Sequence, residues 1–174
     1  WQSGSPDGSR LAFTVAGRVW IMELPGAEPQ RLTSDSDPHF EYAPSWSPDG
    51  LWIAYTTVDE TGAGHVMKIP AIGGEPQQVS VDHGEYSHTR WNSEGTEILA
   101  TLGSGASARH RTMAHNPWYD VVIFPVEGGP GERVVRIEGP TLSTRSQFAR
   151  PSFGPNGRIY YPKMGLNRSD STLL

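Results

Sequence analysis

The sequence contains no cysteine, which excludes a disulfide framework and any cysteine-based metal or redox site within it. It also lacks an apolar run near the roughly 20 residues that a transmembrane helix needs, and the run Val121–Phe124 ends at Pro125. Charged residues make up 19% of the chain, the net charge is −5 at pH 7, and Lys and Arg form no block. We therefore expect no membrane insertion and no nucleic-acid partner.

Glycine and proline are abundant instead, with 20 and 15 of the 174 residues, well above their usual combined share of about an eighth. Turns must therefore be dense. The chain begins at Trp1 and shows no signal-type segment, so it carries no readable targeting information. We expect it to begin within a longer protein.

One short string recurs four times along the chain. A turn rich in Pro, Asp and Gly is followed each time by an alternating apolar segment, and the marker positions are spaced by 42, 45 and 62 residues. The first two spacings match the roughly 40–45 residues of a four-stranded propeller blade. The third spacing includes an insertion. The four marker positions are Pro6, Pro48, Ser93 and Pro155.

Each repeat is predicted to form four short antiparallel strands. An extended segment ends in an aromatic residue, and proline, aspartate and glycine then form a tight turn. Two alternating strands follow, then a glycine-rich turn and a short last strand. In the second repeat these parts are Tyr42–Trp46, Pro48–Gly50, Leu51–Tyr55, Val66–Ile69, Gly73–Pro76 and Gln78–Ser80.

This pattern predicts an all-β fold, a partial β-propeller of about three and a half four-stranded antiparallel blades. We expect residues 1–174 to be a fragment of a single propeller domain, because closed propellers typically have four to eight blades. The alternative is a complete small sandwich with coincidental repeats. The predicted blades span about 1–33, 42–80, 86–135 and 148–174, the last incomplete.

The cycle of Trp46–Gly50, Ile53–Tyr55, Gly73–Pro76 and Leu32–Thr33 resembles the TolB-like β-propeller repeat. That family resemblance covers nearly the whole chain. Such repeats occur in TolB, in tricorn-type and prolyl-oligopeptidase-type peptidases, and ahead of the catalytic domain of exported amidohydrolases. The resemblance implies a periplasmic or secreted protein.

One stretch narrows the resemblance. The insertion Thr101–Arg111, the segment Asn116–Asp120 and the segment Arg150–Pro155 are similar to propellers attached to amidohydrolases. This implies a non-catalytic scaffold that gates substrate for a companion catalytic domain or binds a protein partner. No cofactor is expected in this segment, and the parent would bind a divalent metal outside it. The alternatives are a periplasmic TolB-like protein-binding propeller and the propeller of a prolyl-oligopeptidase-type serine peptidase.

Strand order places two kinds of loop at one end of the predicted blades: the connections between second and third strands, and the linkers between blades. Because loops on rigid scaffolds often carry function, we expect a contact face there. The alternative is that these loops are simply polar. All six histidines, His65 included, are predicted at this end. The candidate binding residues are His39, His83, His88, Arg109, His110, Arg111, His115, Trp118 and Tyr119.

No catalytic or metal site is predicted within the chain. The pairs His83/His88 and His110/His115 match no standard zinc spacing, even with Asp82 nearby. No Gly-x-Ser-x-Gly elbow is present. The aromatic residues that recur once per repeat are expected to pack between neighbouring blades, and these are Trp46, Trp91 and Phe153.

Overall fold

The computed structural model of the chain describes residues 1–34, 36–105, 118–138, 150–162 and 171–173. Within these ranges the secondary structure consists of β-strands and one short 3₁₀ turn, Pro155–Gly157. The strands form four antiparallel sheets in simple meander order.

The first two sheets each contain four strands. Sheet 1 consists of β1 (Gln2–Gly4), β2 (Arg10–Val15), β3 (Arg18–Glu23) and β4 (Gln30–Arg31). Sheet 2 consists of β5 (Phe40–Trp46), β6 (Trp52–Val58), β7 (Val66–Pro70) and β8 (Gln77–Gln78).

Sheet 3 also has four strands: β9 (Tyr86–Trp91), β10 (Glu97–Gly103), β11 (Trp118–Pro125) and β12 (Glu132–Glu138). Sheet 4 has three: β13 (Ser152–Phe153), β14 (Ile159–Pro162) and β15 (Ser171–Leu173). The third strand that the sequence leaves incomplete in the last repeat is therefore β15, which pairs with β14.

The turns between first and second strands form as the sequence predicts. In sheet 2 the Asp49 carboxylate accepts hydrogen bonds from the Ser47 hydroxyl (2.5 Å) and the Leu51 amide (3.0 Å), and Gly50 takes a φ of 72°. In sheet 3 the side-chain oxygen of Asn92 accepts from the amides of Thr96 and Glu97 at 2.9 and 3.1 Å. A short amide side chain thus replaces the Pro-Asp chemistry without loss of the turn.

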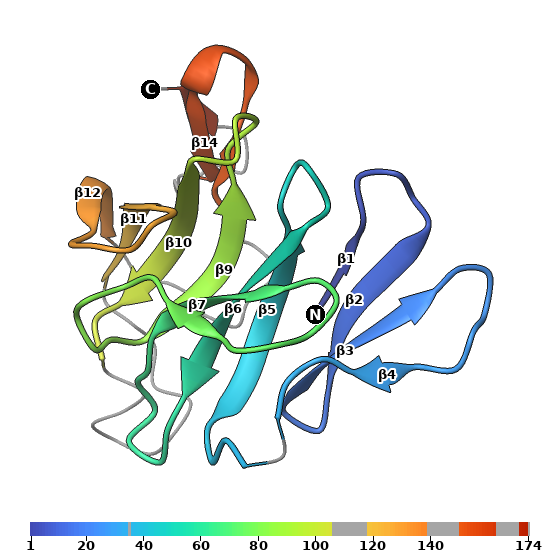
Figure 1. The fold of residues 1–174 in the computed structure, drawn as a ribbon. Helices are drawn as coiled ribbons and strands as arrows, with labels where there is room; N and C mark the ends of the chain where they lie inside the picture. The colour runs from blue at the N-terminus through green and yellow to red at the C-terminus, as the bar shows by residue number, and fades with distance from the viewer. Residues whose placement is uncertain (35, 106–117, 139–149, 163–170, 174) are drawn as a thin grey trace.

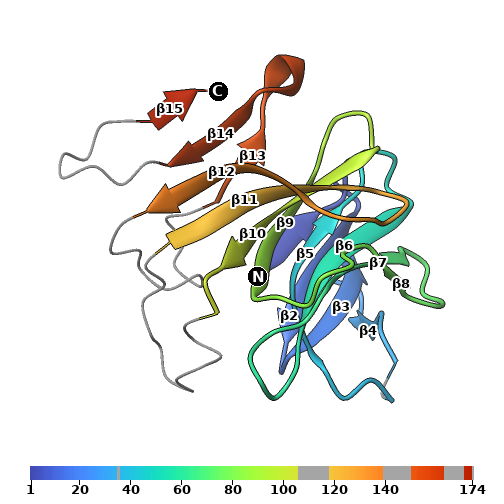
Figure 2. The same ribbon diagram turned by 90° about the vertical axis from the view of Figure 1, so that its left-hand side faces the viewer.

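The sheets radiate from their first strands. Strand β5 contacts β1 on one side and β9 on the other, and β13 contacts β9. Figures 1 and 2 show these inner strands together and the later strands of each sheet fanning outward. The predicted fold class, an all-β partial propeller, is confirmed.

Recurrent tryptophans join neighbouring sheets. The indole N–H of Trp46 donates to the Ser3 carbonyl at 2.9 Å, and that of Trp91 donates to the Ser45 carbonyl at 3.0 Å. Trp46 lies in a core shared by sheets 1 and 2, and Trp91 packs against one shared by sheets 2 and 3. Phe153 packs in the third core, between sheets 3 and 4. The predicted inter-blade role of these aromatics is confirmed.

The inner strands β5 and β9 each contain a bulge. Their pairing with β6 and β10 shifts register between Tyr42 and Ser45 and opposite Leu99–Thr101. At each bulge one residue other than glycine has a positive φ, 53° for Ala43 and 57° for His88. A bulge re-aims a side chain, and bulges are common beside functional sites.

The molecule has two chemically different ends. The end with the Pro-Asp-Gly and glycine-rich turns is called the turn end here. The opposite end, called the loop end, carries the β2–β3 and β6–β7 connections and the linkers between sheets, and it lies at the bottom of Figure 1.

Candidate functional site

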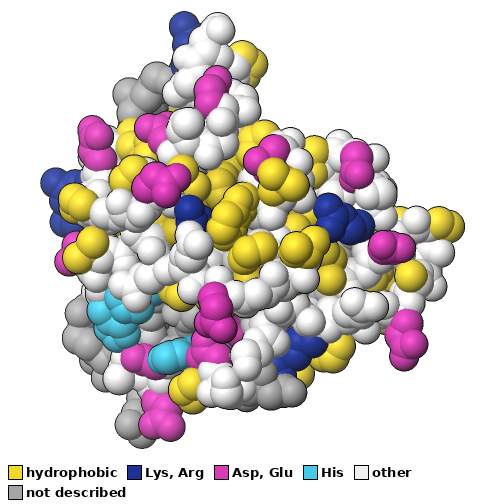
Figure 3. Space-filling model, viewed as in Figure 1, with side chains coloured by type: hydrophobic (Ala, Val, Ile, Leu, Met, Phe, Trp, Pro, Cys, Tyr) yellow, Lys and Arg dark blue, Asp and Glu magenta, His cyan; other side chains and the backbone are white. Residues whose placement is uncertain are grey.

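Two predicted site residues gather with their neighbours at the loop end. The imidazole Nε2 of His83 lies 3.0 Å from a carboxylate oxygen of Asp59, and the rings of His83 and His65 are 5.3 Å apart. His39 lies on the linker before β5, where its Nδ1 is 2.7 Å from the Asp37 carboxylate. Figure 3 shows histidine and acidic side chains together near the lower edge of this face.

The electrostatics of this histidine cluster do not indicate a metal centre. Burial, followed by the neighbouring His83, lowers the pKa of His65. Each exposed histidine is satisfied by a single carboxylate. Among the described residues, no group of three or more His, Asp or Glu side chains is placed to hold a metal ion.

His65 also lies beside a serine, but the pair is structural. Its Nδ1 is 3.2 Å from the Ser80 hydroxyl. That oxygen accepts the backbone amide of Val66 at 3.0 Å, and Ser80 is buried. A nucleophile must reach its substrate, so this geometry fits a cross-strand bond between β7 and the segment after β8.

His88 does not lie on a linker, contrary to the sequence-based expectation. It is part of β9 and only 2% exposed. Its Nδ1 lies 3.0 Å from the Ser87 hydroxyl and 3.3 Å from that of Thr101, and its Nε2 has no hydrogen-bond partner among the described residues. Burial, with Arg150 and Arg90 nearby, lowers the pKa of His88 to about 3, so the ring is neutral at physiological pH.

The expectation that Tyr119 contributes to a binding surface is wrong. Strand β11 begins at Trp118, three residues before the apolar run Val121–Phe124, so Tyr119 pairs with Ile137 and Gly103 inside sheet 3. Its side chain is 4% exposed and packs in the third core. Trp118, beside it, is half-buried, and the Arg136 guanidinium lies 3.7 Å from its ring centroid. The other candidates, Arg109, His110, Arg111 and His115, lie outside the described residues.

A hollow of about 500 Å³ opens on the axis at the turn end. It is lined by the last residues of the inner strands of all four sheets and by the turns that follow them. Three aromatic side chains line it: Trp46, Trp91 and Phe153. The repeat pattern predicts these rings as packing residues and does not show that they also border an open axial space.

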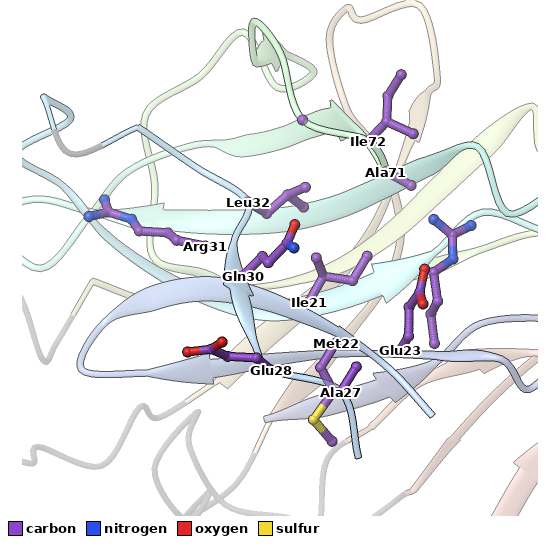
Figure 4. A pocket seen from close by; sticks show the side chains of 12 residues that line it. Ile21, Met22, Glu23, Ala27, Glu28, Gln30, Arg31, Leu32, Ala71 and Ile72 are labelled. Carbon is purple, nitrogen blue, oxygen red and sulfur yellow. The ribbon is translucent and has the colours of Figure 1, made fainter. Parts of the chain in front are cut away.

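A second concavity, of about 470 Å³, lies between the outer parts of sheets 1 and 2. Figure 4 shows Ile21 and Leu32 lining it, with Ile72 on the turn after β7 at its border. Ile72 is 93% exposed. The charged groups at its edges include both Glu23 and Arg31, so the groove favours neither sign of ligand.

Comparisons with known proteins agree with this fold. The chain is 26% identical over 136 residues to the uncharacterized peptidase YuxL of Bacillus subtilis, covering 68% of this chain and 20% of that protein. It is 38% identical over 58 residues to the Tol-Pal system protein TolB of Desulfosudis oleivorans, covering 31% of this chain and 13% of that one. TolB of Acinetobacter baumannii superposes with a TM-score of 0.66 at 23% identity, over 99% of this chain and 39% of that chain.

The repeats of this chain are TolB-like β-propeller repeats. No protein-family model matches the chain. It spans a fifth or less of the curated relatives described above. These relatives are a peptidase and a TolB, and they give no support to an amidohydrolase parent. Within the described residues, no helix is long and apolar enough to cross a membrane.

Proposed function

We propose that this chain is a non-catalytic propeller segment that recognises a peptide or protein on behalf of a peptidase. The observation that carries the proposal is the convergence of side chains from all four sheets on the propeller axis. The sequence match to a peptidase, which extends over 136 residues, supports this parent. The catalytic residues would then lie in a companion domain outside residues 1–174.

A second candidate is a TolB-like protein-binding propeller in the periplasm. The higher local identity, 38% over 58 residues of a Tol-Pal system protein, favours it. The propeller segment would have the same task in both candidates, because each presents one rigid end to a protein chain. They differ in whether hydrolysis follows.

Labelling of the full-length protein with a fluorophosphonate probe separates the candidates. A serine peptidase parent would be labelled on a serine outside residues 1–174, and Ser80→Ala would leave the labelling unchanged. Absence of labelling together with binding to a Tol-Pal system protein would favour the TolB-like candidate. Peptidase activity lost on chelation and restored by a divalent metal would instead support the amidohydrolase-like parent.

A further inference from the structure

One sequence position recurs before the first turn of every sheet. The first turn of each sheet is closed by an amide that donates back to the start of the second strand, from Ser5, Ser47, Asn92 or Gly154. The residues four places before these amides are Trp1, Ala43, His88 and Arg150. Ala43 and His88 lie at the bulges of β5 and β9, whereas Trp1 and Arg150 lie shortly before β1 and β13.

Side chains at this position contact one another. The rings of Trp1 and His88 make an edge contact at 4.6 Å, with an angle of 72° between their planes. The guanidinium carbon of Arg150 lies 5.4 Å from the Trp1 ring centroid. Strand β5 of sheet 2 contacts both β1 and β9, so the Trp1–His88 contact joins two sheets that lie on either side of sheet 2.

Within the described residues, the Nε2 atom of His88 is available to donate or accept a hydrogen bond. It is almost fully buried, and its Nε2 is unpartnered among the described residues. A buried polar atom without a partner destabilises the folded state. His88 also has a φ of 57°, a backbone conformation that residues other than glycine adopt at an energetic cost. Trp1 contacts the imidazole and is itself 37% exposed, so rotation of this indole would open His88 to a ligand.

Two arginines, Arg90 and Arg150, place positive charge near His88. Burial lowers the pKa of His88 and of Arg90, and the positive charge of Arg150 lowers both further. Arg90 is half-buried, and its guanidinium donates to the Thr89 carbonyl at 2.9 Å. Within the part of the chain that the structure describes, neither Arg90 nor Arg150 forms an ion pair. Two guanidiniums without an ion pair among the described residues are unexpected in a chain of net charge −5.

We propose that Arg90, Arg150 and His88, the axial cluster, bind the carboxylate of a peptide, with Trp1 packing beside it. The inference rests on the proposed recognition of a peptide or protein. Guanidinium groups bind carboxylates through paired, charge-assisted hydrogen bonds. The aromatic hollow begins three residues further along the same inner strands, about 10 Å away at the usual rise per residue. A peptide of three or four residues would span both, and aromatic walls suit its side chains better than they suit free phosphate.

Calorimetry on the full-length protein tests the proposal with acetyl-Ala-Ala-Phe as the free acid and as the amide. The free acid should bind at least about tenfold more tightly, since charged hydrogen bonds contribute about 1.5–3 kcal/mol each. Arg150→Gln should remove most of this preference. Arg158→Gln is the matched control, because Arg158 is an exposed arginine of sheet 4 at the turn end, and it should leave the preference unchanged.

Equal binding of acid and amide, or no binding of either, would overturn the proposal. Inorganic phosphate serves as a third probe, and tighter binding of phosphate than of the free acid would also overturn it. In nuclear magnetic resonance spectra the free acid should raise the pKa of His88, and an unmoved His88 would contradict the assignment. Failure of the fluorophosphonate test would leave all these readouts intact, so the two proposals fail separately.

Discussion

Two junctions, one between sheets 1 and 2 and one between sheets 2 and 3, hold neighbouring sheets together through different chemical groups. Both are anchored by a tryptophan that donates to a serine carbonyl of the preceding inner strand. Around this shared anchor the first junction uses buried charge. The second uses hydroxyls and backbone bonds in its interior, with a partly exposed Asp59–His83 contact at the loop end.

The first junction is built around Glu41, whose side chain is fully buried. Its carboxylate accepts the Val19 amide at 2.8 Å and the Thr33 hydroxyl at 2.5 Å, and Arg18 lies 3.7 Å away. Burial raises the pKa of Glu41 despite these partners. Arg10 adds a second cation, 4.6 Å from the centroid of the Trp46 ring.

The second junction differs, because its carboxylate–histidine pair, Asp59 and His83, is partly exposed at the loop end. Thr89, fully buried, donates to the Ala43 carbonyl at 2.7 Å. Gly64 and Gly84 exchange two backbone hydrogen bonds, at 2.8 and 2.9 Å, between the β6–β7 connection and the linker to β9. The Gly129 amide donates to the Val79 carbonyl at 3.0 Å. The repeat therefore fixes the anchor and leaves the chemistry around it free, so the two junctions should respond differently to substitution and pH.

The largest effect is expected from the anchors themselves. Trp46→Ala should lower the free energy of unfolding by about 3–5 kcal/mol, the usual range for a core tryptophan. Trp91→Ala should cost less, because Trp91 is only half-buried while Trp46 is 7% exposed. Urea denaturation of both variants measures the difference. A greater loss for Trp91→Ala would contradict the comparison.

The next effect concerns the buried carboxylate. Glu41→Ala should cost about 2–4 kcal/mol, because the Val19 amide and the Thr33 hydroxyl lose their acceptor inside the core. Glu41→Gln retains an acceptor and should cost less. Chemical denaturation at pH 7 ranks the two variants, and equal losses would show that the acceptor contributes nothing.

The direction of the Glu41 pKa shift predicts how the stability difference between the original chain and Glu41→Gln depends on pH. The pKa of Glu41 is raised above its ordinary 4.5, so the folded state holds the proton more tightly than the unfolded state. Its stabilising contribution is present below pH 4.5 and falls as pH rises through the folded pKa. The stability of the original chain relative to Glu41→Gln should therefore decline between pH 4.5 and 7. A flat difference would show that Glu41 is not desolvated.

A smaller loss of stability is expected at the junction between sheets 2 and 3. Thr89→Val keeps the side-chain shape and removes the hydroxyl that caps the Ala43 carbonyl, so it should cost about 1–3 kcal/mol. The cost should not change between pH 5 and 8. Thr14→Val is the matched control, because the buried Thr14 hydroxyl has no partner among the described residues. The control should be neutral or slightly stabilising, and a larger loss there would reverse the interpretation.

The smallest effect is expected beside the groove of the first junction. Ile72→Ser should change the free energy of unfolding by less than about 0.5 kcal/mol, because a side chain that is 93% exposed contributes little to packing. Thermal denaturation checks this. A clear loss would show that Ile72 closes the junction in solution.

The sequence predicts the repeats, turns and anchors well because each depends on local chemistry. Asp49 and Gly50 form their turn from neighbouring residues alone, and Trp46 recurs at a fixed place. The bulge at His88 is different. It depends on a mismatch between two strands, and it moves this histidine from an expected linker to the axis.

Tyr119 shows the second limit of prediction. Its burial depends on how far β11 extends along β12, and a repeat pattern does not specify strand length. The meeting of Trp1 with His88 depends on closure of three sheets around an axis. Such contacts join residues 87 positions apart in the chain, and no local pattern reports them.

The position before the first turn of each sheet has a practical consequence for how such a protein can be altered. At this position the four sheets carry an indole, a methyl group, an imidazole and a guanidinium, and the indole contacts the last two. The turns and anchors that hold the sheets lie elsewhere on the strands. The residue at this position can therefore be exchanged in one sheet at a time, while the turns and tryptophan anchors that hold the sheets stay the same.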